Sequence, residues 1–134
     1  MSPRDEKPAA AANRLQSILR ASPAGVGVAR NHTIVEFNGR LMEITGYSRE
    51  ELTGMPGRRL YPSEAEFEFV GREKHRQMAL HGRGTVECRW VRKDGALIDV
   101  LLSSAPLDPA DPDQGVTFIA LDISEQRRAA RALE

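Results

Sequence analysis

The 134-residue chain has the length of one domain, and its 40% hydrophobic and 28% charged residues are typical of a folded, soluble protein. Its 19 basic and 19 acidic residues cancel, which removes the broad positive field on which nucleic-acid binding depends. There is no run of about 18 apolar residues, and the start, MSPRDEKPAAAANR, is charged. We therefore expect a cytoplasmic module that neither binds nucleic acid nor inserts into a membrane. The single Cys88 is consistent with a reducing compartment.

The N-terminal part of the chain predicts a tail followed by a short amphipathic helix. Residues 1–12 carry charges, two prolines and alanines, and we interpret them as a tail or the start of that helix. Apolar residues then follow at helical spacing until Ser22-Pro23, where proline ends the pattern. The narrow apolar stripe could pack on its own domain or against a second copy, and the sequence leaves both open.

Two apolar runs, residues 25–29 and 33–37, are separated by a tight connection and predict a pair of strands. Asn38 stands where a helix should begin, and Gly46 where it should end.

The next residues predict further helices from their capping signals. Ser48 with Glu51 has the spacing of a capping box, which predicts a second short helix. Ser63 with Glu66 repeats this signal and predicts a longer helix to about His81, with a break at Gly71.

Beyond Gly82 the apolar pattern changes to period two, which predicts strands. Residues 86–90 and 98–102 alternate on either side of the turn signal Asp94-Gly95, as an antiparallel hairpin would. Residues 106–114 are rich in Pro and Asp and predict an exposed loop. Residues 116–121 are apolar on both faces, which favours a central strand, and residues 126–134 predict an exit helix.

Four segments in this order resemble the PAS domain family. They are Phe37-Asn38 before a short helix, the run TGYSREELTG at residues 45–54, the hairpin ECRWVRKDG at residues 87–95, and DISEQR at residues 122–127. The chain departs from the family pattern in having Gly39 where proline is frequent and Ser124 where threonine is more common. The resemblance spans roughly residues 13–128, nearly the whole of the expected ordered chain.

The resemblance implies an α+β fold with a five-stranded antiparallel sheet, several short helices on one face, and flanking N- and C-terminal helices. Residues 13–123 would form the PAS-like sensory domain, and residues 124–134 the start of a signalling helix. Such a module senses and relays a signal within a larger protein, such as a sensor histidine kinase of a two-component system or a diguanylate cyclase. The sequence contains no Ser-His or Cys-His nucleophile pattern and no glycine-rich phosphate loop, so we expect no catalysis by this segment.

The family's cavity lies between sheet and helices, and it holds haem, a flavin, a small carboxylic acid or nothing. We expect no cofactor or a small molecule here, because the haem and flavin signals are weak: His75 is a lone histidine in a charged stretch, and Trp90 is more simply a core residue. No spacing of histidines or carboxylates indicates a metal site. Bulky side chains could instead fill the cavity of a ligand-free dimerisation and relay scaffold. The candidate pocket residues are Asn38, Met42, Cys88, Trp90, Val100, Leu102 and Phe118.

The exit signature supplies the candidate signal relay. Asp122 could cap the outgoing helix with Glu125 three residues on, and relatives suggest that this aspartate also pairs with a basic residue, here Arg92 or Lys93. The alternative is a plain N-cap worth about 1 kcal/mol. The relay candidates are Asp122, Ile123, Ser124, Arg92 and Lys93. A homodimer is expected through apolar residues of the flanking helices, namely Leu15, Ile18, Leu19, Ile123, Ala130 and Leu133, with a covalently linked output domain in the parent protein.

Overall fold

A computed structural model describes residues 8–111 and 114–133 of the chain. Residues 1–7 of the expected tail, residues 112–113 of the expected loop and Glu134 lie outside the described residues. The elements follow in chain order as α1 (Pro8–Ala21), β1 (Gly25–Arg30), β2 (Thr33–Phe37), α2 (Gly39–Thr45), α3 (Arg49–Leu52), the 3₁₀ helix η2 (Gly57–Leu60), α4 (Glu64–His81), β3 (Gly84–Val91), β4 (Leu97–Pro106), β5 (Val116–Asp122) and α5 (Ser124–Ala132).

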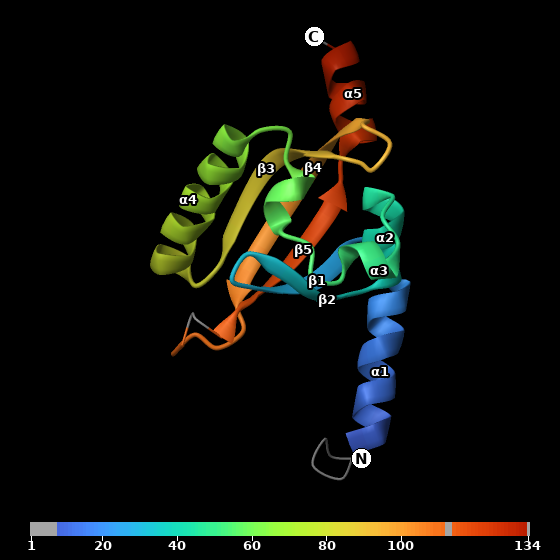
Figure 1. Ribbon diagram of the computed structural model, residues 1–134, viewed down its shortest axis with the longest axis vertical. Coiled ribbons are helices and arrows are strands. Elements are labelled where there is room, and N and C mark those ends of the chain that lie inside the picture. The colour runs from blue at the N-terminus through green and yellow to red at the C-terminus, as the bar shows by residue number, and fades with distance from the viewer. Residues whose placement is uncertain (1–7, 112–113, 134) are drawn as a thin grey trace.

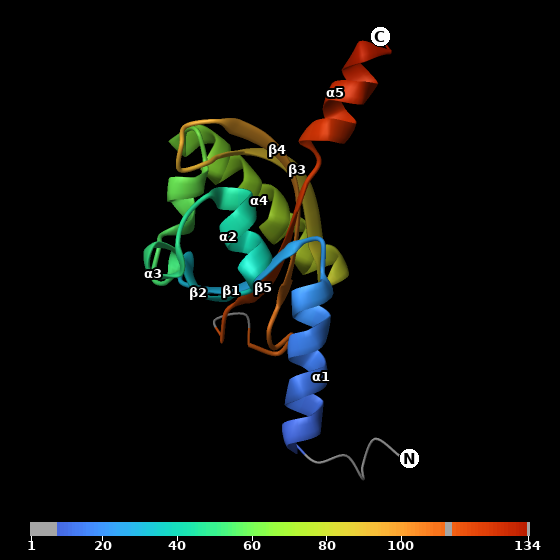
Figure 2. The same ribbon diagram turned by 90° about the vertical axis from the view of Figure 1, so that its right-hand side faces the viewer.

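The five strands form one antiparallel sheet in the order β2-β1-β5-β4-β3 (Figure 1). This confirms the expected α+β architecture and the central position predicted for residues 116–121, because β5 pairs with both β1 and β4. Helices α2, α3 and α4 lie over one face of the sheet, while α1 and α5 project from opposite ends of the body (Figure 2).

The helices begin and end where local chemistry predicts. Asn38 caps α2 by accepting from the Leu41 N–H, and Gly46 ends that helix in the left-handed conformation at a φ of 80°. Ser48 and Glu51 form the complete capping box of α3. Such caps satisfy backbone groups that have no partner inside the helix, so a short helix ends at a defined residue.

The prediction for α4 was wrong in one respect. Its start at Ser63 and end at Gly82 are as predicted, but the helix runs through Gly71 without a break. A glycine inside a helix costs about 1 kcal/mol relative to alanine but keeps its backbone hydrogen bond, so packing of α4 on β3 outweighs that cost. The 3₁₀ helix η2, which follows Pro56, was not predicted.

The core lies between the sheet and the three covering helices. Leu41 of α2, Leu52 of α3 and Val100 of β4 are fully buried, and they belong to one continuous cluster that contains Trp90 and Phe118. Among the described residues, no helix is both long and apolar enough to cross a membrane.

Candidate functional site

The inner face of the sheet brings most of the predicted pocket residues together. Cys88 pairs with Val100 across β3 and β4, so their side chains point to the same face. Six of the seven candidates share one apolar cluster: Trp90, Val100, Leu102 and Phe118 are buried in it, with Met42 and Cys88 packed against it. That they contact a ligand stays a prediction.

Asn38, the seventh candidate, has a structural role in the described contacts. Its Oδ1 accepts from the Val26 N–H at 2.9 Å as well as from Leu41. Its Nδ2 donates to the carbonyls of Leu19 and Ala24, both at 3.1 Å. The side chain therefore joins the end of α1, strand β1 and the start of α2.

Between α4 and β3, polar groups that the sequence did not single out approach the candidates Cys88 and Trp90. The Tyr61 ring lies edge-on to Trp90, with 6.3 Å between ring centroids, and its hydroxyl and the Cys88 thiol influence each other's pKa. Burial raises the pKa of Tyr61 and raises that of Cys88 to about 12, so both stay protonated at neutral pH. The positive charge of Lys74 on α4 lowers the pKa of the same thiol, but by less than burial raises it. Burial also lowers the pKa of Lys74 itself.

A sequence signal for Lys74 did exist. It follows the buried Val70 by four residues and precedes the half-buried Met78 by four, so it lies on the face of α4 that meets the sheet. The surrounding charged residues masked this spacing. Tyr61 gave no periodic signal, because it lies in the irregular segment between η2 and α4.

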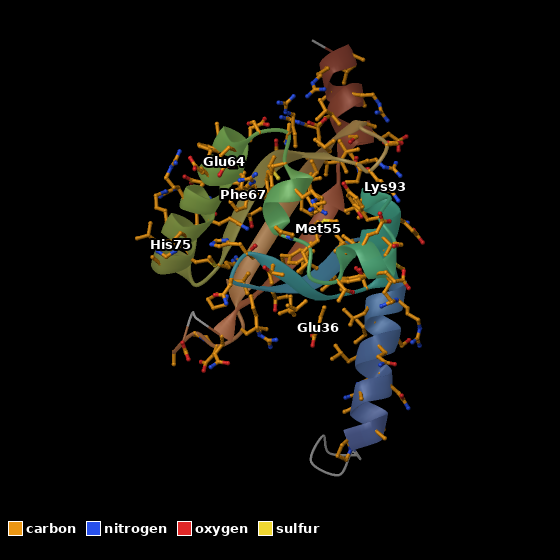
Figure 3. The ribbon with its side chains drawn as sticks, in the orientation of Figure 1. Glu36, Met55, Glu64, Phe67, His75 and Lys93 are labelled. Atoms are coloured by element: carbon orange, nitrogen blue, oxygen red, sulfur yellow. The ribbon has the colours of Figure 1, made fainter. Side chains whose placement is uncertain are left out.

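His75, the remote haem-ligand candidate, is exposed on α4 and lies at the outer side of the molecule (Figure 3). From this position it does not reach the interior as an axial ligand would. Within residues 8–111 and 114–133, no group of three His, Cys, Asp or Glu side chains could hold a metal ion.

The relay residues are arranged differently from the prediction. Asp122 is exposed, and its Oδ1 accepts from the Ser124 N–H at 2.9 Å, so it does serve the first turn of α5, though not through Glu125. The predicted pairing of Asp122 with Arg92 or Lys93 does not occur among the described ion pairs and hydrogen bonds. Both basic residues instead contact helices α2 and α3.

Arg92 and Lys93 instead join the β3–β4 hairpin to the helical layer. Lys93 Nζ lies 2.9 Å from the Glu51 carboxylate, and the Lys93 N–H donates to the Thr45 carbonyl, also at 2.9 Å (Figure 3 labels Lys93 beside α2). Arg92 donates to the Glu43 carbonyl at 3.4 Å. The Lys93 bond, with the Ser48 N–H, lowers the pKa of Glu51 to about 2.

The exit helix α5 is joined to the sheet chiefly through Asp99 of β4. The Asp99 N–H donates to Ser124 Oγ at 2.9 Å, and the Ile123 N–H donates to the Asp99 carbonyl at 2.8 Å. Ser124 is the single buried residue of α5 and is 9% exposed. Ser124 and Ile123, two of the predicted relay residues, thus contact the sheet directly.

Two ion pairs extend this junction along α5. Arg127 lies 3.0 Å from Glu87 of β3, and Arg131 lies 3.8 Å from Asp99. Together these residues line a groove of about 200 Å³ between the helix and the sheet. The sequence did not indicate the pairing of Glu87, Asp99, Arg127 and Arg131, because it depends on the direction in which α5 leaves the sheet.

Comparison with known proteins identifies the family. A model of the PAS domain matches residues 23–125. The chain belongs to the PAS family. It is 32% identical over 111 residues to the sensor protein TdiS of Thauera aromatica; the match covers 83% of this chain but only 20% of TdiS.

Solved PAS domains share the fold. The PAS domain of a LuxR-family transcriptional regulator from Burkholderia thailandensis, solved in complex with ethanol, is 27% identical with a TM-score of 0.74, over 81% of this chain and 96% of that one. A PAS domain from Colwellia psychrerythraea is 20% identical with a TM-score of 0.76, over 86% and 98% of the two chains. The chain is therefore a PAS sensory domain similar to sensor proteins.

Proposed function

We propose that this PAS domain is the sensory and relay module of a larger signal transduction protein, and that it passes a ligand or redox signal to an output domain without catalysing a reaction. Residues 13–123 would receive the signal, and residues 124–134 would begin the helix that transmits it. The match to one fifth of a named sensor protein supports a longer parent. A sensor histidine kinase or a cyclase is the kind of output we expect.

The observation that carries this proposal is the polar attachment of α5. The helix is held at its first turn by Ser124 and Asp99 and further along by two ion pairs, without a buried apolar side chain; the Arg127–Glu87 pair is exposed, and the Arg131–Asp99 pair is half-buried at Asp99. Exposed ion pairs contribute only about 0–1 kcal/mol each. Small movements of β3 and β4 could therefore redirect α5 at low cost.

A ligand-free dimerisation and relay scaffold is the second candidate function. It is favoured by the filled inner face, where large side chains such as Trp90 and Phe118 occupy the region of the expected pocket. In this case the signal would enter through the flanking helices and not through a bound molecule. The relative solved with ethanol supports the ligand-sensing alternative.

The relay is tested by Ser124→Ala. This change leaves the Asp99 N–H without its acceptor, so we expect faster backbone amide exchange throughout α5 and an altered signal response in the full-length parent. Ser103→Ala, which removes a hydroxyl bonded to Thr85 on the same sheet, is the matched control and should leave α5 unchanged. Unchanged exchange and unchanged output in Ser124→Ala would refute the relay.

A further inference from the structure

Arg89 of β3 stands between two carboxylates that belong to different parts of the molecule. Its Nε and Nη2 donate to Glu66 Oε1 at 3.0 and 2.7 Å. Glu66 lies in the first turn of α4, at the upper end of that helix in Figure 3, and α5 leaves the body at the same end. The second carboxylate is that of Asp99, which stands directly opposite Arg89 on β4. Arg89 therefore has one partner in the helical layer and an alternative one beside the exit helix.

Asp99 is the closer neighbour of Arg89 on the sheet. In an antiparallel pair of strands, opposite residues that exchange no backbone hydrogen bonds have the closer side chains. Arg89 and Asp99 form such a pair, because the N–H and the carbonyl of Asp99 bond to Ser124 and Ile123 instead. Opposite charges in this position attract each other. Yet none of the described ion pairs and hydrogen bonds joins these two side chains.

The Asp99 carboxylate is instead held loosely by α5. Its described ion pair with Arg131 spans 3.8 Å, compared with 2.7 Å between Arg89 and Glu66. The Arg131 side chain is mostly exposed, at 59%. Arg89, Asp99 and Arg131 line the same groove of about 200 Å³. The Arg89 guanidinium thus has open space in which to turn toward Asp99.

The ion pair of Arg89 with Glu66 can be exchanged at low cost. Both Arg89 donors use one carboxylate oxygen, so the pair lacks the two parallel bonds that make arginine–carboxylate pairs strong. Both side chains are also partly exposed, and water screens pairs of this kind. The choice of Arg89 between the two carboxylates therefore depends on how closely the first turn of α4 lies to β3.

We propose that Arg89 is the switch of the relay: it pairs with Glu66 while α4 lies close to β3, and with Asp99 when the first turn of α4 moves away. This inference rests on the proposed function and names the residue that couples the helical layer to α5. In the second state, the guanidinium groups of Arg89 and Arg131 compete for one carboxylate, and the more distant Arg131 is displaced. Helix α5 then loses one of its two ion pairs and turns more freely on the sheet.

Glu66→Gln imitates the second state, because it removes the charge that holds Arg89 on α4. Amide hydrogen exchange of residues 127–133, followed by NMR, should become about two- to fivefold faster, as expected for the loss of one partly exposed ion pair. Arg89→Met breaks the same ion pair but also removes the competing cation, so exchange in α5 should equal that of the parent. The double variant E66Q/R89M should match the parent as well.

Glu64→Gln is the matched control. It removes a carboxylate that lies 2.7 Å from Arg58, in the same turn of α4 as Glu66, and it should leave exchange in α5 unchanged. Because Glu66→Gln and Arg89→Met break the same ion pair, a general loss of stability would affect both variants alike. Only the switch predicts that they differ.

Three results would overturn the proposal: unchanged exchange in Glu66→Gln; equally faster exchange in Glu66→Gln and Arg89→Met, as expected of an ion pair that only stabilises the fold; or faster exchange that persists in the double variant. None of these variants alters Ser124. A negative result beside a positive Ser124→Ala result would therefore remove the switch and leave the relay intact, whereas a negative Ser124→Ala result refutes the relay itself.

Discussion

At the scale of single residues, Asn38 shows how one side chain organises several elements. It is 9% exposed and makes four hydrogen bonds to backbone groups of Leu19, Ala24, Val26 and Leu41. A buried amide can be tolerated only when its donors and acceptor are satisfied in this way. Asn38 thus fixes where α1 ends relative to β1, which matters if α1 takes part in signalling.

Replacing Asn38 with alanine should lower the free energy of unfolding by about 3 kcal/mol, because buried backbone groups lose their partners. Urea denaturation measures this loss. Ser63→Ala removes an N-cap with a single backbone bond and should cost only about 1 kcal/mol. Equal losses in the two variants would show that the tie to α1 and β1 contributes little.

At the scale of elements, a glycine of β3 and a glycine of α4 have opposite surroundings. A Cβ at Gly84 would lie 3.0 Å from the Lys74 carbonyl oxygen, so the helix sits as close to the strand as backbone atoms permit. Gly71, inside α4, has no atom within 4 Å of its would-be Cβ. One glycine is therefore required by close approach, and the other only weakens its helix.

Gly84→Ala should destabilise the domain by about 1–3 kcal/mol, because α4 must move away from β3. Gly71→Ala should stabilise it by about 0.5–1 kcal/mol through higher helix propensity. Thermal unfolding of the two variants provides the comparison. Destabilisation by Gly71→Ala would indicate that the helix needs flexibility at this position.

At the scale of the whole molecule, apolar side chains remain exposed on α1 and on the sheet face that α2, α3 and α4 leave open. Leu15 and Ile18 of α1 are 58% and 60% exposed, and Ile119 of β5 is 45% exposed. No residue of α1 is buried. This arrangement favours the second of the two possibilities left open by the sequence, in which the stripe packs against another copy.

We expect a homodimer in solution, and Ile18→Glu should convert it to a folded monomer, because the residue contributes to no buried core within one copy. Sedimentation velocity measures the state. Ser17→Glu, which places the same charge on the opposite side of α1, should leave the dimer intact. A parent chain that is monomeric at all accessible concentrations would contradict the prediction.

Local chemistry in the sequence determined most elements of this PAS domain. The caps at Asn38 and Ser48, the left-handed glycine at Gly46 and the alternation through Trp90 each depend on interactions within a few residues, so they can be predicted without the fold. The inward direction of Cys88, Trp90, Val100 and Leu102 followed from the same period of two.

Only the tertiary structure decided which polar groups meet. Whether Asp122 pairs with Lys93 or Lys93 with Glu51 depends on the distance between α3 and the β3–β4 hairpin, segments 42 residues apart. The approach of Lys74 to Cys88 depends in turn on how closely α4 lies over Gly84. Such pairings are fixed by the packing of whole elements, since a charged side chain has no sequence-local reason to prefer one partner over another.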